Sequence, residues 1–316
     1  MKAAVVHDPA EGPRYGSFEL PLKEGDMVLD VLAAGLSPRV RSGASGSHYT
    51  SSGSFPLVPG IDGVGRSPDG RRFYFLGGSE VAGTMAEKAI ADPRGMIPLP
   101  ENVRSSTIAA GMLPAISSWV ALTKRAPIQP GQHVLVLGAT GVAGLLAVQI
   151  AKRLGAGRVV AAGRDADALE RTRMLGADEA VALTGDGTDG EKVAQAASEV
   201  DIVLDYLWGS VTSLVMPALC RHRQAGSRAL HWVLIGSVTG DAIALSSVLL
   251  RKRNLHILGS GQGATSNADL FGAATDVAAA FAAGQLDVRV REVPLAEVAT
   301  WWAATPASGE RIVFVP

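Results

Sequence analysis

The sequence has little cysteine and no long run of like charges. Its 316 residues include one cysteine, Cys220, which excludes a disulfide within the chain and a cysteine-rich zinc site. The formal net charge of −1 gives no support for binding to nucleic acid. The first residues lack the apolar core of a signal peptide, and we expect a cytoplasmic protein.

Glycine and apolar residues, in contrast, are plentiful. The 37 glycines indicate many tight turns and an α/β architecture, and 316 residues are enough for two domains. The stretch 134–151 contains no charged residue and passes as a membrane span by composition alone. Its central glycines and its strand–turn–helix pattern favour a buried segment of a globular fold, so we expect no membrane contact.

The most informative stretch is 133–165. Val134–Leu137 is a short apolar run typical of a buried strand, and it is followed by a glycine-rich turn and an apolar helix. A second strand is expected at 158–162. The turn contains Gly141 and Gly144 at the spacing of G-x-G-x-x-G, with alanine at the first position, and the whole unit has the length expected for dinucleotide binding.

The end of the second strand distinguishes NADP from NAD. About 20 residues after the turn, where an NAD site carries an acid for the ribose, the chain has Gly163 followed by Arg164. A guanidinium at this place offers a bidentate clamp for a 2′-phosphate, so the sequence favours NADPH. Two alternatives stay open: Asp165 supplies the acid of an NAD site, or Arg164 is a solvated residue at the end of a strand.

Strands and helices alternate up to residue 265. Further strands are expected at 176–181, 201–205, 231–235 and 255–258, which together predict a doubly wound parallel sheet of six strands. Ligands bind at the carboxyl ends of such strands. The cofactor-binding residues expected at these ends are Ala139, Thr140, Gly141, Val142, Gly144, Gly163, Arg164, Tyr206, Gly236, Ser237, Gly259, Ser260 and Gly261.

The segments on either side of this sheet have a different pattern. Residues 1–122 contain short strands joined by turns such as Ser67-Pro68-Asp69-Gly70, which predicts a hairpin within a small barrel or sandwich. Residues 37–59 form a long polar loop of the kind that often carries function, and two short helices are expected at 105–111 and 114–123. The tail, 266–316, returns to the first pattern.

Four motifs together carry a resemblance to a known family. They are Val58-Pro59-Gly60-Ile61-Asp62-Gly63-Val64-Gly65, Ser117-Ser118-Trp119 before Gln129-Pro130-Gly131, Val134–Gly144, and Leu175-Gly176-Ala177-Asp178. The chain resembles the medium-chain dehydrogenase/reductase superfamily, in its zinc-free quinone oxidoreductase branch. The resemblance implies a GroES-like β-rich catalytic domain at 1–122 and 266–316 and a Rossmann NADP(H)-binding domain at 123–265. It also implies a homodimer that joins the edge strands at 255–258.

The resemblance also gives the positions at which zinc alcohol dehydrogenases bind zinc. The first cysteine ligand corresponds to Ser37, and the histidine of Gly-His-Glu corresponds to Ile61 in Gly60-Ile61-Asp62. No cysteine lies near 115–118 for the third ligand, and the four-cysteine structural lobe is missing. Serine and isoleucine do not build a zinc site, so we expect no metal. Ser37-Pro38 also departs from the Asn-Pro that is usual in the quinone oxidoreductase branch.

Without zinc, the expected hydride acceptor is already activated by conjugation. Quinones and α,β-unsaturated carbonyls fit, because the charge formed on their oxygen needs only hydrogen-bond donors. The candidate donors are Tyr49, Ser37 and Arg41, whereas Asp62 is expected to hold the loop. Asp205 is expected either near the cofactor or as a helix cap. The alternative functions are an enoyl or alkenal double-bond reductase and a non-catalytic NADPH-binding sensor.

Overall fold

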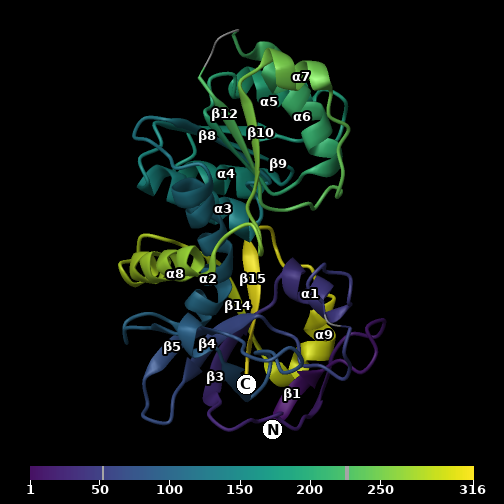
Figure 1. The fold of residues 1–316 in the computed structure, drawn as a ribbon, viewed down its shortest axis with the longest axis vertical. Helices are drawn as coiled ribbons and strands as arrows, with labels where there is room; N and C mark the ends of the chain where they lie inside the picture. Colours follow the sequence, from purple (N-terminus) through teal and green to yellow (C-terminus); the bar gives the residue numbers. More distant parts are fainter. Residues whose placement is uncertain (52, 225–227) are drawn as a thin grey trace. The chain divides into compact units, whose positions relative to one another are not determined.

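The computed structural model describes residues 1–51, 53–224 and 228–316, which fold into two compact units (Figure 1). The first unit is Met1–Leu113 with Ala274–Pro316, and the second is Pro114–Ala273. The divisions fall inside helices α2 (Ser105–Val120) and α8 (Asn267–Ala282). The second unit therefore interrupts the first, as an inserted domain does.

The second unit contains the parallel sheet. Its strand order is β10-β9-β8-β11-β12-β13, and all five neighbouring pairs are parallel. The chain builds outward from β8 on one side and then returns to start β11 on the other, so the order reverses between these two strands. The α/β fold class is confirmed. The strands are β8 (His133–Leu137), β9 (Arg158–Gly163), β10 (Glu179–Ala182), β11 (Ile202–Asp205), β12 (Leu230–Leu234) and β13 (Leu255–Gly259).

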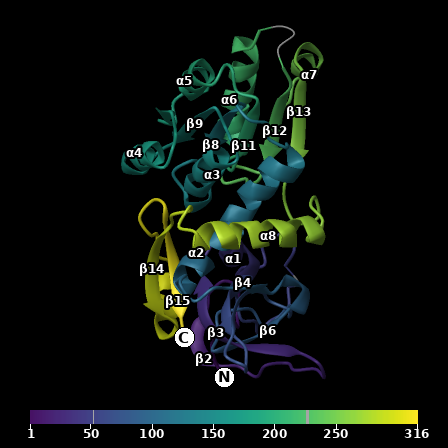
Figure 2. The same ribbon diagram turned by 90° about the vertical axis from the view of Figure 1, so that its left-hand side faces the viewer.

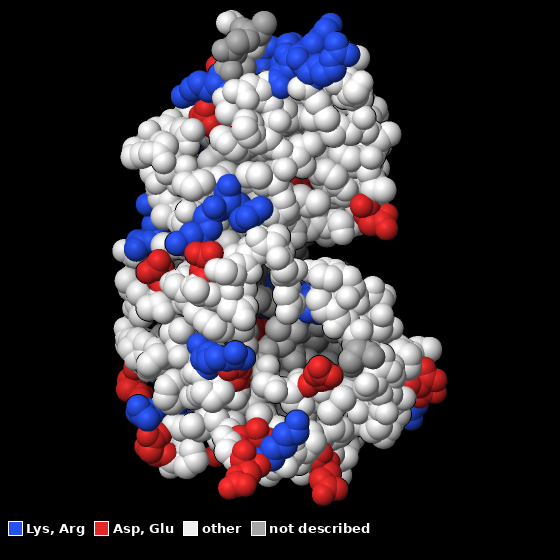
Figure 3. Space-filling model, viewed as in Figure 1, with Lys and Arg blue, Asp and Glu red and all other residues white. Residues whose placement is uncertain are grey.

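Helices cover both faces of this sheet. One face carries a core in which Leu135, Val160 and the fully buried Trp232 pack against α5 and α6, while α3 and α4 pack on strands β8, β9 and β10. The helices are α3 (Val142–Arg153), α4 (Ala166–Met174), α5 (Asp189–Ala196), α6 (Gly209–His222) and α7 (Ser247–Lys252). The sequence did not predict α7, a six-residue helix with no buried residue. A basic cluster over α7 includes Arg251 and Lys252 (Figure 3).

The first unit is built on strands that are far apart in the sequence. Its larger sheet has the order β14-β15-β3-β4-β5-β7, with β6 also paired to β3, and β1 and β2 form a separate pair. Figure 2 shows β14 and β15 beside β3. The strands are β1 (Lys2–Val5), β2 (Arg14–Ser17), β3 (Met27–Gly35), β4 (Asp62–Arg66), β5 (Arg72–Leu76), β6 (Lys88–Ala91), β7 (Ile97–Pro98), β14 (Arg289–Pro294) and β15 (Glu310–Val315). The predicted hairpin is confirmed by β4 and β5.

Short helices join these strands. Pro93–Gly95 and Leu295–Glu297 are 3₁₀ turns, and α9 (Val298–Trp302) lies before β15. Residues 37–59 are not wholly a loop, because they contain α1 (Pro38–Ala44). Ser37 caps this helix by accepting the Val40 N–H at 3.2 Å, and Pro38 suits its first turn.

The two helices expected at 105–111 and 114–123 are one helix, so that prediction was wrong. Helix α2 continues through Pro114, and a π-helical turn, Ala121–Arg125, extends it. An internal proline costs a helix about 3 kcal/mol. Burial of Ile108, Met112 and Ala115, each 0% exposed, offsets that cost.

Among the residues that the structure describes, one helical stretch is long and apolar enough to cross a membrane by length and composition. It is Ser105–Arg125, and 72% of its most apolar window is buried inside the protein. A buried core helix passes the same test by composition. The other apolar stretch, 134–151, is divided between β8, a turn and α3.

Candidate functional site

The glycine-rich turn joins β8 to α3 at the carboxyl edge of the parallel sheet. The N–H groups of Gly138 and Ala139 both donate to the Ala162 carbonyl at 2.9 Å, which ties the turn to β9. A Cβ on Gly144 would overlap the Gly138 carbonyl oxygen and lie 2.5 Å from Cα of Ala139, so only glycine lets the helix approach so closely. A Cβ on Gly141, in contrast, would meet only the Gly138 oxygen at 3.8 Å.

Gly141 is therefore not required by packing within the protein. It is exposed at the N-terminus of α3, and no side chain caps the helix there. The first N–H groups of a helix have no partner inside the helix and carry its positive dipole end, which attracts anions. An open cradle at a helix N-terminus is the geometry that a pyrophosphate needs. The residues of this turn thus fit a dinucleotide.

The end of β9 lies next to this turn. Arg164 is exposed, and among the described residues it has no hydrogen bond or ion pair. Asp165 instead caps α4, because its Oδ1 accepts the Ala168 N–H at 2.8 Å. A Cβ on Gly163 would overlap the Thr140 side chain, so this glycine is also required for packing. The arginine is free to bind a ligand, whereas the neighbouring carboxylate already has a structural role.

The end of β11 is held by a buried carboxylate. Asp205 is 0% exposed, and its Oδ1 accepts the N–H groups of Leu207 and Trp208 at 2.8 and 2.9 Å. Its Oδ2 accepts Thr212 Oγ1 at 2.5 Å and Trp232 Nε1 at 2.8 Å. Trp208, whose N–H is held by this carboxylate, adopts φ +52°, a conformation that costs a non-glycine residue about 1–3 kcal/mol.

The side chain of Tyr206 has its hydrogen-bond partner within the second unit. Its hydroxyl lies 2.6 Å from Ser118 Oγ, and burial raises the pKa of Tyr206 to about 12. The Tyr206 phenol is therefore engaged inside the protein, since the residue is 8% exposed. Gly236 lies close to the same residue, since a Cβ on Gly236 would lie 2.9 Å from the Tyr206 carbonyl oxygen.

The other expected residues lie farther along the same edge. Ser237 is exposed, Ser260 is buried, and the Ser260 N–H donates to the Leu234 carbonyl at 2.8 Å. Gly259 and Gly261 are exposed on either side of Ser260, at the end of β13. Because neighbouring strands are about 4.8 Å apart, β13 lies about 14 Å from β8. The expected residues therefore lie in a row along this edge of the sheet and are not gathered at one point.

The candidate donors lie in the first unit. Ser37 and Arg41 flank the first turn of α1, where the Arg41 N–H donates to the Ser37 carbonyl at 3.0 Å. Tyr49 lies in the following loop with 73% of its surface exposed, and its ring stacks on His48 at 4.2 Å between centroids. The structure thus brings Ser37 and Arg41 together on one helix and places Tyr49 separately.

The positions implied for zinc do not fit a metal. The Ser37 oxygen accepts the α1 cap bond, and Ile61 packs against a core cluster of apolar residues. Within residues 1–51, 53–224 and 228–316, no three His, Cys, Asp or Glu side chains form a possible metal-binding group. The side chains at these positions therefore do not suit zinc.

Sequence reasoning missed a buried polar cluster in the first unit. Asp62 is 3% exposed and Tyr74 1%, while Arg311 on β15 is 8% exposed. Desolvation raises the pKa of Asp62 to about 6 despite the nearby Tyr74 hydroxyl and Arg311. Burial likewise lowers the pKa of Arg311 to about 10 and raises that of Tyr74 well above its ordinary value. The sequence does contain a signal for this cluster, because Arg311 is a charged residue just before an apolar stretch typical of a strand. Its partners, however, are distant in the sequence.

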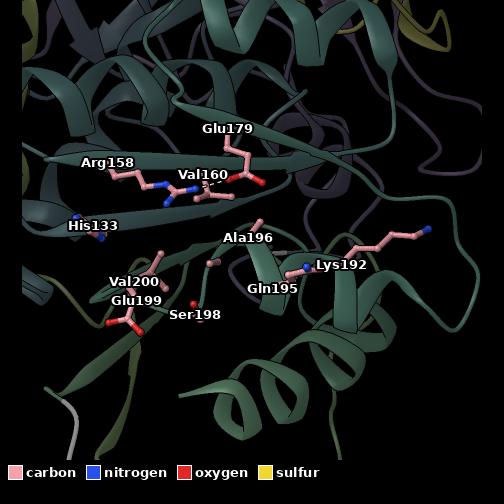
Figure 4. Close-up of a pocket in the computed structure, with 11 residues that line it drawn as sticks. His133, Arg158, Val160, Glu179, Lys192, Gln195, Ala196, Ser198, Glu199 and Val200 are labelled. Atoms are coloured by element: carbon pink, nitrogen blue, oxygen red, sulfur yellow. Dashed lines mark hydrogen bonds and ion pairs between the residues drawn. The ribbon is translucent and has the colours of Figure 1, made fainter. Parts of the chain in front are cut away.

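A second concavity lies at the opposite edge of the parallel sheet (Figure 4). It has a volume of about 400 Å³ and lies where β8, β9 and β10 begin. An ion pair between Arg158 and Glu179 lies along it, and the end of α5 forms its other side. This pocket is separate from the glycine-rich turn, which follows the carboxyl end of β8.

Comparison with known proteins identifies the family. Over 334 aligned residues the chain is 32% identical to the "Probable NADPH-dependent quinone reductase tdiC" of Emericella nidulans, and the match covers 92% of each chain. The chain belongs to the medium-chain dehydrogenase/reductase superfamily. The match places it in the quinone-reductase-like branch of that superfamily.

Other members of the superfamily match over different lengths. A family model described as "Zinc-binding dehydrogenase" matches residues 142–279, a range that contains neither Ser37 nor Ile61. The crystal structure of the quinone oxidoreductase from Thermus thermophilus, solved also with NADPH, is 28% identical, with a TM-score of 0.79 and full coverage of both chains. The "NADPH-dependent alkenal/one oxidoreductase, chloroplastic" of Arabidopsis thaliana is 28% identical, over 59% of this chain and 51% of that protein.

Proposed function

We propose that this chain is an NADPH-dependent oxidoreductase that reduces a quinone or another conjugated carbonyl without zinc. The observation that carries the cofactor assignment is the exposed Arg164, which has no partner in the described part of the chain and lies beside the glycine-rich turn, while the neighbouring acid, Asp165, caps a helix. The names of the relatives, a quinone reductase and an alkenal/one oxidoreductase that depend on NADPH, support the same assignment.

Each part of the carboxyl edge has a proposed role toward NADPH. The turn residues Ala139, Thr140, Gly141, Val142 and Gly144 hold the pyrophosphate through backbone N–H groups and the α3 dipole. Gly163 and Arg164 hold the 2′-phosphate, with the guanidinium as a charge-assisted donor. The remaining contacts come from the row formed by Tyr206, Gly236, Ser237, Gly259, Ser260 and Gly261.

NADPH supplies the hydride, and the first unit supplies donors for the substrate oxygen. The Ser37 oxygen accepts the Val40 N–H, so its own hydroxyl proton is left to donate. Arg41 contributes a positive charge on the same helix, and Tyr49 a phenol on the loop. Donors at this oxygen stabilise the enolate or phenolate that hydride addition leaves. A substrate that is conjugated needs no Lewis acid, which agrees with the residues at Ser37 and Ile61.

The proposal extends to assembly and domain roles. Residues 1–122 and 266–316 form the substrate domain, 123–265 bind the cofactor, and the enzyme is a cytoplasmic homodimer. Strand β13 lies at the edge of the six-stranded sheet, so its outer backbone groups can pair with a second copy. Light scattering is expected to give about twice the monomer mass of 32.6 kDa. A monomer mass would refute the dimer.

The alternative catalytic function is reduction of the double bond of an enone or alkenal, which the Arabidopsis relative favours. Oxidation of NADPH with a panel of quinones, enones and alkenals separates the two, provided that the products are identified. Turnover of quinones to hydroquinones supports the first function, and saturated carbonyl products support the second. Tight NADPH binding without turnover of any member would instead support a sensor.

A further inference from the structure

The start of α1 is attached to the C-terminal segment of the chain. Nη1 of Arg311 donates to the Leu36 carbonyl at 3.0 Å, and the Leu36 N–H donates to the Ile312 carbonyl at 2.9 Å. Both backbone groups of Leu36 are therefore held by β15. Ser37, the next residue, caps α1, so its position follows from that of Leu36.

A second arginine attaches the same helix to the same segment. Arg41 donates from NH2 to the Ala304 carbonyl at 2.7 Å. Ala304 lies in the connection between α9 and β15. Two guanidinium groups thus connect the first turn of α1 to 304–312. They add to the backbone bond between Leu36 and Ile312.

Burial makes this attachment dependent on a compensating charge. Arg311 is 8% exposed, and its charge interacts favourably with Asp62 and unfavourably with Arg41. Tyr74 is the other titratable group that faces Asp62. The Nε atoms of Arg311 and Arg41 are buried and have no hydrogen-bond partner in the described part of the chain. An uncompensated buried charge is strongly destabilising, so the nearby Asp62 carboxylate offsets part of the cost of burying the Arg311 guanidinium.

We propose that Arg311 and Asp62 are positioning residues for the substrate: Arg311 fixes Leu36, and through it Ser37 and Arg41, while Asp62 balances the buried charge. The proposal rests on the function proposed above, because it assigns substrate binding to Ser37 and Arg41. Neither Arg311 nor Asp62 contacts the substrate. They act by fixing the positions of Ser37 and Arg41.

The chain offers a matched control for Arg311. Arg72 on β5 is also a largely buried arginine of the first unit that binds carbonyls, those of Val103 at 3.1 Å and Pro100 at 2.6 Å. Its Nε is likewise buried without a hydrogen-bond partner among the described residues. Arg72 does not hold α1. Arg311→Lys and Arg72→Lys therefore each remove a buried guanidinium that binds backbone carbonyls, but only Arg311→Lys removes one that holds α1.

The test compares these variants in steady-state kinetics with NADPH and the best quinone or enone of the panel. Arg311→Lys is expected to raise the KM for that substrate about tenfold, the effect of losing one charge-assisted bond, and to change the dissociation constant of NADPH less than about twofold. Arg72→Lys is expected to leave the KM unchanged. Asp62→Asn, which retains the side-chain shape but removes the charge, is expected to raise the KM as Arg311→Lys does.

A second measurement is independent of turnover. Hydrogen exchange of the α1 amides is expected to accelerate in Arg311→Lys and Asp62→Asn and to stay at the wild-type rate in Arg72→Lys. Equal effects of the two lysine variants on KM or exchange, or no effect of Arg311→Lys, would overturn the proposal. A wild-type protein without turnover would contradict the proposed function, while the exchange data would still decide whether Arg311 holds α1. If Arg311→Lys fails to fold, Asp62→Asn carries the same expectations.

Discussion

Replacement of Arg164 by alanine is the sharpest test of the cofactor assignment. The side chain is exposed and has no partner among the described residues, so its removal leaves no buried group unsatisfied. Stability is therefore expected to change by less than about 0.5 kcal/mol. A charge-assisted bond to a phosphate contributes about 1.5–3 kcal/mol, which corresponds to a weakening of NADPH binding by about 10- to 150-fold. NADH has no 2′-phosphate, and its affinity is expected to stay the same.

Calorimetric titration with NADPH and NADH measures both affinities on one preparation. The control is Arg66→Ala, which removes another exposed arginine, at the end of β4 in the first unit. Three results would refute the reasoning: wild-type protein that binds NADH as tightly as NADPH, an Arg164→Ala variant that keeps its preference for NADPH, or one that loses both cofactors equally. The last result would place Arg164 at the pyrophosphate.

Three further predictions concern the turn, the loop and the buried carboxyl. Gly144→Ala places a methyl group against the backbone of Gly138 and is expected to cost about 1–3 kcal/mol in urea unfolding and to weaken NADPH binding. Tyr49→Phe, at a residue 73% exposed, is expected to leave the melting temperature unchanged and to lower kcat/KM about tenfold; an unchanged kcat/KM would remove Tyr49 from the mechanism. The pKa of Asp62 rises from 3.8 to about 6 on folding, so the folded protein holds this proton more tightly than the unfolded chain does. The contribution of Asp62 to the free energy of unfolding is therefore expected to fall by about 3 kcal/mol as the pH rises from about 4 to about 6. The Asp62→Asn variant is expected to lack this pH dependence. Parallel curves of unfolding free energy against pH for the variant and the wild type would contradict the prediction.

The parallel sheet and the glycine-rich turn of the proposed nucleotide site were predictable because their signals are local. A buried parallel strand is a short apolar run, and the turn after β8 is defined by Gly141 and Gly144 within a few residues. The role of the acid beside Arg164 required the structure, since only the bond from the Ala168 N–H to Asp165 shows that this carboxylate caps α4. The sequence left open whether Asp165 supplies the acid of an NAD site.

The errors have physical causes of two kinds. Helix α1 was missed because glycine and serine dominate 37–59, although Ser37-Pro38 is a sound start signal for a helix. Helix α2 was divided at Pro114 because the cost of a proline is visible in the sequence and the burial that offsets it is not. The Asp62–Arg311 interaction could not be predicted at all, because it joins β4 to β15, two strands of one sheet that are far apart in the chain.

The two halves of the proposed chemistry therefore differ in how the sequence encodes them. In the proposed site, NADPH meets mostly backbone, so the site appears in the sequence as glycines, and only Arg164 adds a side chain whose charge would select the phosphate. The proposed substrate donors are side chains, and those of Ser37 and Arg41 depend on Leu36 and Ala304, which fix where α1 begins. On this proposal, a change at Arg311 of β15, which is distant from Ser37 and Arg41 in the sequence, alters substrate binding while cofactor binding stays the same. This separation explains why the cofactor can be inferred from one short motif, whereas the identity of the carbonyl depends on contacts between segments at opposite ends of the chain.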